Sequence, residues 1–264
     1  MHSIYKFSTC NVHRESPLRV RVEDLTVAYN GEPVLSGVNL EFRGPGLVQI
    51  IGPNGAGKTT FLKAILGLIK PARGRVFLDG FEATGRPEMV GRYAGYVPQN
   101  PSAPKLSPMT VREFVETSLR LRGVTRARER AVEVLHTLGI RGEVLESRLW
   151  ELSMGMLQRV FIARAIAPDP KMLVMDEPLA SVDPAGRMEI ARIIAGLARE
   201  RLVLMTSHDP SLLLGHTDII VVINRDLIAS GPPEEVYRED VLRRVYGESV
   251  ARGLVLAGEG GAHG

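Results

Sequence analysis

The chain has 264 residues, of which 44% are hydrophobic and 24% are charged, as is typical of a globular protein and not of a disordered chain. Its 33 basic and 30 acidic residues give a formal net charge of +3, which is too small to indicate a nucleic-acid partner, and we expect none. Residues 44–57 form the longest stretch without a charged side chain, and this stretch is too short for a membrane-spanning helix.

The N-terminal 17 residues contain no apolar segment of the kind found in signal peptides. They are predicted to be a flexible extension. Cys10 is the only cysteine, so the chain can form neither an internal disulfide nor a cysteine-based zinc finger. The spacing of His2, Cys10 and His13 matches no metal-ligand pattern. Residues 251–264 are predicted to be a flexible glycine-rich tail, which leaves an ordered domain over residues 18–250.

The first half of that domain is predicted to combine strands with one helix. Asn30-Gly31 is a turn signal between two segments of alternating apolar residues. Pro71 and Gly74 are expected to end the helix. The expected strands cover residues 18–28, 34–42, 46–51 and 75–78, and the expected helix covers residues 59–69.

The second half is predicted to begin with a loop over residues 100–108, which contains three prolines. After it we expect helices over residues 111–123, 127–138, 155–167 and 184–199, strands over 172–175, 202–206 and 218–223, and a helical stretch from Pro233. The alternation of strands and helices at both ends predicts an α/β fold with a mainly parallel sheet. A helical subdomain over about residues 100–167 is expected to be inserted in it.

A phosphate-binding loop is the strongest functional signal in the sequence. It follows a predicted buried strand, precedes a predicted helix, and fits G-x-x-x-x-G-K-[ST] in full. Such a loop holds phosphate oxygens with its backbone N–H groups and the positive end of the following helix. Lys58 is expected to reach the β- and γ-phosphates, and Thr59 to bind Mg²⁺. The loop consists of Gly52, Pro53, Asn54, Gly55, Ala56, Gly57, Lys58, Thr59 and Thr60.

Two adjacent carboxylates follow the predicted strand over residues 172–175. Asp176 is expected to face Mg²⁺, and Glu177 is expected to act as the general base that polarises the attacking water. Taken alone, this pattern also fits a strand that simply ends in an acidic turn. Its occurrence behind a phosphate-binding loop favours the catalytic interpretation.

A third segment resembles the signature motif of ABC-transporter ATPase subunits, whose usual form is LSGGQ-x-QR. The segment reads Leu152, Ser153, Met154, Gly155, Met156, Leu157, Gln158 and Arg159. Further segments in the same order resemble other family elements: Gln99 the Q-loop, residues 180–183 the D-loop, His208 the switch histidine and Tyr29 the aromatic residue that stacks on adenine. The resemblance covers roughly residues 18–247.

The resemblance implies a P-loop NTPase core with an N-terminal antiparallel β subdomain, and a head-to-tail dimer that binds ATP between its two copies. It implies that Lys58, Gln99, Glu177 and His208 act in catalysis and that Gln99 joins Thr59 and Asp176 at Mg²⁺. It implies nucleotide contacts from Tyr29, Ser153, Gly155 and Asp183. Met154 and Met156 depart from the motif, which leaves open how tightly the dimer closes and how the ribose is held.

The resemblance also implies a function in transport. Because the sequence contains no predicted membrane span, we expect separate integral membrane permease subunits, an extracellular substrate-binding protein and a position on the cytoplasmic face of the cell membrane. Import is expected, with most similarity to zinc/manganese or iron-chelate uptake ATPases. The alternatives are an exporter ATPase and a soluble ABC ATPase that acts on nucleic acid or ribosomes. The loop over residues 100–108 is expected to be the surface to which the permease binds.

Trp150 is expected to lie in the hydrophobic core.

Overall fold

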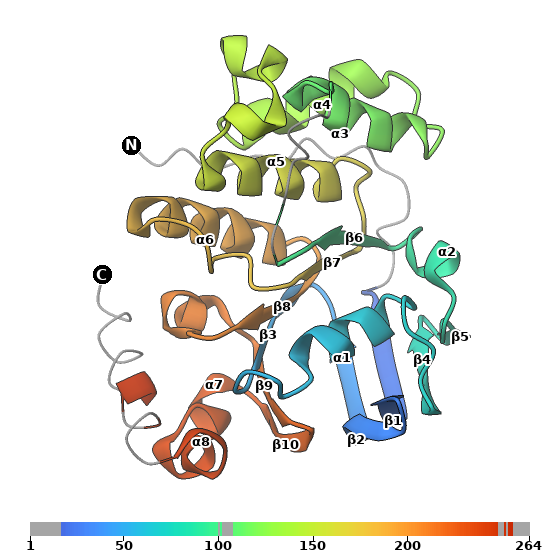
Figure 1. The fold of residues 1–264 in the computed structure, drawn as a ribbon, viewed down its shortest axis with the longest axis vertical. Helices are drawn as coiled ribbons and strands as arrows, with labels where there is room; N and C mark the ends of the chain where they lie inside the picture. Colours follow the sequence, from blue (N-terminus) through green and yellow to red (C-terminus); the bar gives the residue numbers. More distant parts are fainter. Residues whose placement is uncertain (1–16, 100, 102–107, 248–250, 252, 256–264) are drawn as a thin grey trace.

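Figure 1 shows the computed structural model of the chain, which describes residues 17–99, 101, 108–247, 251 and 253–255. Among these residues, two sheets form the framework of the fold. The smaller sheet is antiparallel, with strand order β2-β1-β4-β5. Its strands are β1 (Arg19–Tyr29), β2 (Glu32–Arg43), β4 (Arg73–Leu78) and β5 (Phe81–Glu82).

The larger sheet has the strand order β10-β9-β3-β8-β7-β6 and is parallel except for the antiparallel edge strand β10. Its central strand β3 is buried at every position, as expected for a parallel strand covered on both faces. The strands are β3 (Gly46–Ile51), β6 (Ala94–Val97), β7 (Met172–Met175), β8 (Leu202–Ser207), β9 (Ile219–Asn224) and β10 (Asp226–Gly231).

Helices cover both faces and one edge of this sheet (Figure 1). The α-helices are α1 (Lys58–Ile65), α2 (Pro87–Val90), α3 (Val111–Arg120), α4 (Ala127–Thr137), α5 (Met154–Ile166), α6 (Pro184–Ala198), α7 (Pro233–Val236) and α8 (Glu239–Tyr246). The 3₁₀-helices are η1 (Gly142–Glu146), η2 (Leu149–Glu151) and η3 (Ser211–His216). No helix of the described segments is both long enough and apolar enough to cross a bilayer.

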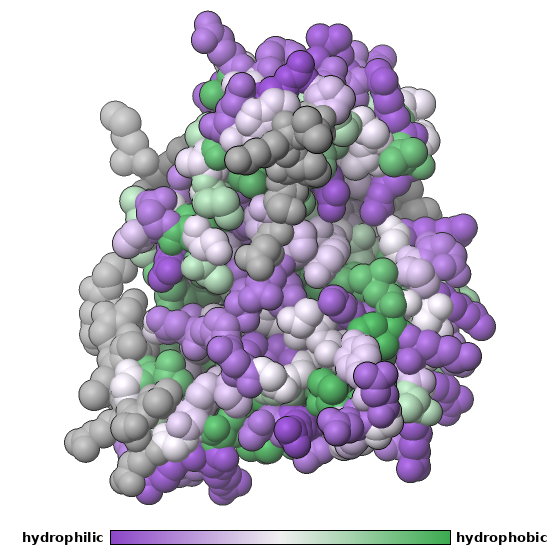
Figure 2. All heavy atoms as spheres, viewed as in Figure 1, coloured by the Kyte–Doolittle hydropathy of each residue, from purple (hydrophilic) through white to green (hydrophobic). Residues whose placement is uncertain are grey.

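Three clusters of buried apolar residues correspond to these layers. The first cluster joins α3, α4, α5 and α6 to one face of the parallel sheet, with Leu173 and Met205 among its members. The second lies between the antiparallel sheet, α1 and the opposite face. The third packs α7 and α8 against β3 and β9 at the sheet edge, through Ile51 and Ile220. Figure 2 shows a mostly hydrophilic face, with apolar residues gathered near the end of α1, beyond which Leu68 is exposed.

The α/β fold with a mainly parallel sheet and an antiparallel β part is confirmed. The predicted end of the first helix is wrong, because α1 stops at Ile65 instead of continuing to residue 69. Gly67 adopts the left-handed φ of 69°, and the Leu68 amide donates to the carbonyl of Lys63, which closes the helix end as in a Schellman motif. The antiparallel sheet also draws β4 and β5 from beyond α1, so it is not wholly N-terminal.

The sequence patterns did not predict several short elements, namely β5, β6, β10 and α2. The start of the predicted C-terminal tail is also wrong, since residues 251 and 253–255 are helical. Leu254 packs with the third cluster and its carbonyl accepts a hydrogen bond from the Tyr237 hydroxyl at 2.8 Å, which explains this order. The loop predicted over residues 100–108 lies largely outside the described residues, as does the N-terminal extension.

Trp150 is not a core residue, contrary to the prediction. It belongs to η2 and 39% of its surface is exposed, whereas its neighbour Leu149 is buried. A three-residue 3₁₀-helix can direct only one of two adjacent side chains inward, and here the smaller one packs against the helices.

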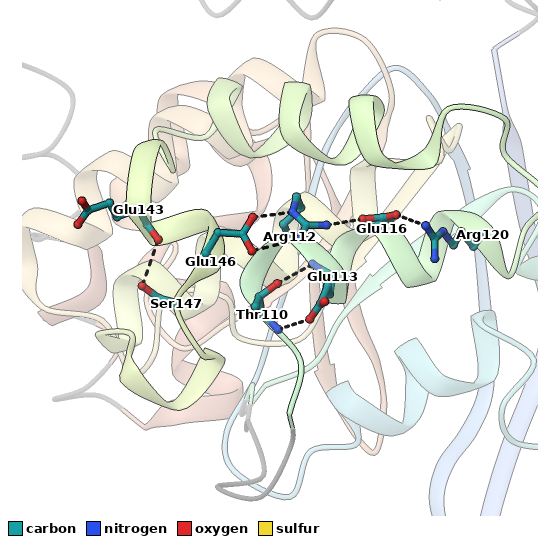
Figure 3. Close-up of polar contacts among 8 residues, drawn as sticks. All are labelled: Thr110, Arg112, Glu113, Glu116, Arg120, Glu143, Glu146 and Ser147. Atoms are coloured by element: carbon teal, nitrogen blue, oxygen red, sulfur yellow. Dashed lines mark hydrogen bonds and ion pairs between the residues drawn. The ribbon is translucent and has the colours of Figure 1, made fainter.

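An ion-pair network stabilises the helical part of the chain (Figure 3). Arg112 of α3 donates to both carboxylate oxygens of Glu146 in η1, at 2.7 and 3.1 Å, and to Glu116 at 2.7 Å. Glu116 is only 4% exposed and also pairs with Arg120. Thr110 begins α3 with a capping box, in which it exchanges hydrogen bonds with Glu113.

We predict that Arg112→Met lowers the free energy of unfolding by about 2 kcal/mol, because it removes charge-assisted hydrogen bonds and leaves the buried Glu116 with one partner. Urea unfolding followed by circular dichroism measures this change. Arg43→Met is the control, since Arg43 pairs with Glu41 on the exposed surface and should change stability very little. Equal effects of the two substitutions would contradict the prediction.

Candidate functional site

The carboxyl ends of four neighbouring parallel strands meet at one edge of the larger sheet. The strands are β3, β8, β7 and β6, and their registers align Ile51 with Ser207, Met175 with Met205 and Val97 with Met175. Each strand is followed directly or within two residues by candidate site residues, which are Gly52, His208, the pair Asp176 and Glu177, and Gln99. Ligands bind at this edge in open parallel α/β sheets.

The phosphate-binding loop begins where its backbone lies against another strand. A Cβ atom at Gly52 would lie 2.1 Å from the backbone carbonyl oxygen of Ile223 in β9, so only glycine fits there. Lys58 is 6% exposed, and its Nζ donates to the carbonyl of Gly52 at 2.7 Å and to that of Pro53 at 3.1 Å. Burial lowers the pKa of the Lys58 ammonium, although the carboxylates of Glu177 and Asp176 oppose this. Two carbonyl partners therefore hold the cation at the loop.

Asp176 connects three parts of the site through one oxygen. Its Oδ1 accepts hydrogen bonds from the hydroxyl of Thr206 at 2.7 Å and from that of Thr59 at 3.2 Å. Thr206 lies on β8 and Thr59 on the first turn of α1. The carboxylate is 2% exposed, so these bonds are made away from bulk water.

Glu177 has both carboxylate oxygens in contact with other candidate residues. Gln99 Nε2 donates to Oε2 at 2.7 Å, and His208 Nε2 lies 2.7 Å from Oε1. The Glu177 amide donates to the Thr206 hydroxyl at 2.8 Å. Glu177 adopts a left-handed φ of 47°, which is uncommon for residues other than glycine and typical of functional sites. The structure thus brings Gln99, Glu177 and His208 together.

A cavity of about 440 Å³ opens beside these residues. It is lined by residues 54–60 of the loop and by the three residues just described, and its size suits a small molecule. The lining residues are Val34, Asn54, Gly55, Ala56, Gly57, Lys58, Thr59, Thr60, Gln99, Glu177 and His208.

Six of the predicted nucleotide contacts do not line this cavity, namely Tyr29, Gly52, Pro53, Ser153, Gly155 and Asp183. Tyr29 is 48% exposed at the end of β1, beside the hairpin that contributes Val34. Ser153 caps α5 by accepting from the Met156 amide at 3.3 Å, and Asp183 caps α6 by accepting from the Gly186 amide at 3.1 Å. A Cβ atom on Gly155 would lie 3.4 Å from Val182, so the starts of α5 and α6 are neighbours.

The oxygen atoms near Lys58 have the chemistry that a divalent cation such as Mg²⁺ prefers. The Thr59 hydroxyl and an Asp176 carboxylate oxygen lie 3.2 Å apart at the loop, and Mg²⁺ is usually held by one or two such groups together with substrate phosphates. Over the described ranges, no group of three or more His, Cys, Asp or Glu could hold a metal ion without a substrate. The residues present therefore fit a cation that enters with phosphates.

Thr206 is the site residue that sequence reasoning missed. Its hydroxyl bonds to Asp176 and accepts from the Glu177 amide, and thereby fixes the position of both acidic residues. A single threonine inside an apolar strand gives no motif signal. Its place, two residues before His208, could have identified it only with knowledge that β7 and β8 are paired.

The chain belongs to the ABC transporter family, because the family model matches residues 35–180, more than half of its length. The curated relatives include the zinc import ATP-binding protein ZnuC of Pseudomonas aeruginosa, which is 39% identical over 240 residues, 90% of this chain and 82% of the relative. ZnuC of Paramagnetospirillum magneticum is 35% identical over 247 residues, 93% of this chain and 88% of the relative. The chain is an ATPase of this family.

Solved structures show the same fold. An ATP-binding cassette of an ABC transporter superposes with a TM-score of 0.73 at 28% identity, and the match covers 85% of this chain and 93% of that one. A structure described as an inward-facing ABC transporter of metal-chelate type gives a TM-score of 0.74 at 22% identity, with coverage of 87% and 89%. An ABC ATPase of this kind works together with a membrane permease.

We predict that Gly52→Ala weakens ATP binding and stability, because the new methyl group displaces either the loop or the Ile223 carbonyl. Titration with a fluorescent ATP analogue and thermal unfolding measure the two effects. Gly31→Ala is the control: its φ is 85° but no atom lies near its Cβ position, so it should cost only about 1 kcal/mol and leave ATP affinity unchanged. Wild-type affinity in Gly52→Ala would contradict the close approach.

Proposed function

We propose that this chain is the ATP-hydrolysing subunit of a metal-uptake ABC importer and acts on the cytoplasmic face of the membrane. The proposal that the chain hydrolyses ATP rests on the contact of Glu177 with both Gln99 and His208. These three residues line the same cavity as Lys58. The metal cargo is supported by the relatives, which are named zinc import ATP-binding proteins.

The residues of the loop would bind the substrate ATP. The Lys58 ammonium is already desolvated and held by two carbonyls, so phosphate oxygens can compete for it with little further loss of hydration. The backbone N–H groups of residues 54–58 and the positive end of α1 add to the attraction. Thr59 and Asp176 would hold Mg²⁺, which neutralises phosphate charge when it is bound.

Glu177 would accept the proton of the attacking water. Gln99 and His208 orient its carboxylate from two sides, and the Thr206 hydroxyl fixes its backbone. Catalytic groups held in this way need little rearrangement before reaction. His208 is well placed to respond to the γ-phosphate, because it lines the same cavity.

Ser153, Gly155 and Asp183 are proposed to act on the nucleotide of a second copy. They lie at the starts of α5 and α6 and do not line the cavity of their own chain. A head-to-tail dimer would place them over the partner's nucleotide. Met154 is 43% exposed beside Ser153, so the departure from the usual motif adds an apolar group to this surface.

The remaining partners and the division of the chain are also proposals. We infer an extracellular substrate-binding protein that delivers the metal to the permease, as the import named for the relatives suggests. Residues 18–250 are proposed as the ATPase domain, with the helical insert over about residues 100–167 and a flexible extension at residues 1–17. An exporter or a soluble ATPase would not require metal or a binding protein for activity.

The transport proposal is tested by reconstituting the chain with its permease in liposomes and measuring ATP-dependent zinc or manganese uptake. We predict that Lys58→Ala abolishes uptake and most ATP binding, because the loop loses its only ammonium. Lys63→Ala is the control, since Lys63 lies on the same helix at its last turn. ATP-driven efflux, or ATPase activity without any response to metal and binding protein, would contradict import.

We predict that Glu177→Gln binds ATP, loses at least about a hundredfold in kcat, and accumulates as an ATP-bound dimer. The substitution keeps the size of the side chain but removes its basicity. Gel filtration with ATP detects the dimer, and phosphate release measures kcat. Normal turnover together with a monomeric elution volume would exclude Glu177 as the base.

A further inference from the structure

Gln49 is a polar residue at the centre of a buried strand. It is 0% exposed, while the other residues of β3 are glycine or aliphatic. Its register partners in the sheet are Met205 and Ile220, which belong to the first and third core clusters respectively. An amide at such a position costs free energy unless it is hydrogen-bonded.

Gln49 forms two hydrogen bonds to the segment that follows His208. Its Nε2 donates to the Thr217 hydroxyl at 2.8 Å and to the Pro210 carbonyl at 3.1 Å. The Thr217 hydroxyl in turn donates to the carbonyl of Leu213 at 2.8 Å. We call residues 207–217 the switch segment. Gln49 therefore holds both the beginning and the end of the switch segment against β3.

The middle of the switch segment, η3, lies over the strand between two core clusters. Leu213 packs in the first cluster and Leu214 packs against the third. Near its start, the Ser207 hydroxyl donates to the Asp209 carbonyl at 2.7 Å and the Ser211 amide donates to Asp209 Oδ1 at 3.0 Å. The Pro210 carbonyl accepts from the Leu213 amide at 3.1 Å, and the amide of Gln49 joins the same carbonyl to the sheet.

The other side of the switch segment borders a cavity of about 280 Å³, which is lined in part by Glu177, His208, Asp209 and Leu212. The side chain of His208 is 47% exposed, so packing does little to fix it. The position of the imidazole is therefore set by the backbone between Ser207, at the end of β8, and Pro210, which Gln49 holds.

We propose that Gln49 is a positioning residue for hydrolysis, which fixes the switch segment through Pro210 and Thr217 and so keeps His208 in contact with Glu177. The inference rests on the proposed role of His208. The Gln49 side chain makes its contacts on the switch segment and does not line the nucleotide cavity. Loss of its bonds should consequently affect the chemical step and leave ATP binding in place.

The first test compares Gln49→Met with the wild-type full-length chain. Methionine has a similar shape but donates no hydrogen bond. The expected result is a decrease in kcat between about tenfold and a hundredfold, with the dissociation constant of ATP within about twofold of wild type. An unchanged kcat, or a decrease in ATP affinity that accounts for the whole effect, would overturn the proposal.

The second test separates positioning from folding. Thr217→Ser keeps the hydroxyl that accepts from Gln49, and Thr217→Val removes it with little change in shape. Thr217→Ser is expected to retain wild-type kcat, whereas Thr217→Val is expected to lose a substantial part of it. This pair also provides the answer if Gln49→Met does not fold. Equal kcat values for the two Thr217 variants would overturn the proposal.

The third test observes the imidazole without turnover. The ring signals of His208 in a proton–nitrogen NMR spectrum, assigned with His208→Ala, are expected to shift and broaden in Gln49→Met in the absence of ATP. In a His208→Ala background, Gln49→Met should have no further effect on kcat. Unchanged ring signals, or multiplicative effects of the two substitutions, would overturn the proposal. If His208→Ala alone hydrolysed ATP normally, the proposed function of His208 would fail first, and the two failures are thereby distinguished.

Discussion

One carboxylate oxygen, Oδ1 of Asp176, joins the parts of the site that come from different strands. It accepts from Thr59 at the start of α1 and from Thr206 on β8, while the strand that carries it, β7, lies between β8 and β6. With 2% exposure, the carboxylate cannot exchange these partners for bulk water without opening the site. The spacing between the phosphate-binding loop and Glu177 therefore depends on this oxygen.

The geometry around Glu177 depends on the hydrogen bond between Asp176 and Thr206. Thr206 uses its hydroxyl twice, as donor to Asp176 and as acceptor for the Glu177 amide. The Glu177 backbone is thereby held in a left-handed conformation that it would seldom adopt alone. Its carboxylate then meets Gln99 and His208, which follow the neighbouring strands β6 and β8. Parallel pairing of the strands supplies the order of these residues, and hydrogen bonds supply their orientation.

Many of the strands and helices could be predicted from sequence, because the pattern that defines each of them is local. The boundaries of β3 and β7 were predicted to the residue, because each is a short apolar run bounded by glycine, proline or acidic residues. The end of α1 was missed because Pro71 is a stronger signal in sequence than Gly67, although Gly67 ends the helix. Strand β10 was missed because its pairing with β9 is a tertiary contact and its burial is incomplete.

In the site, too, residues in local motifs were predicted and residues that act through tertiary contacts were not. The loop around Lys58 and the acidic pair have fixed spacings and were found by motif, and Gln99 and His208 were found by resemblance to a family. Thr206 and Gln49 were not found, since each is a polar residue in an apolar strand and acts on a segment far away in sequence. Such residues become visible only when the register of the parallel strands is known.

The first core cluster links the helices α3 and α4 to the parallel sheet. It contains Val115 of α3 and Leu135 of α4 together with Leu173 and Met175 of β7, the strand that ends at Asp176. A close-packed cluster resists separation, since opening it would expose apolar surface to water. A movement of the helices relative to the sheet therefore has to displace the packed side chains that lie between them. Movement of this kind reaches β7, the strand that is followed directly by Asp176 and Glu177.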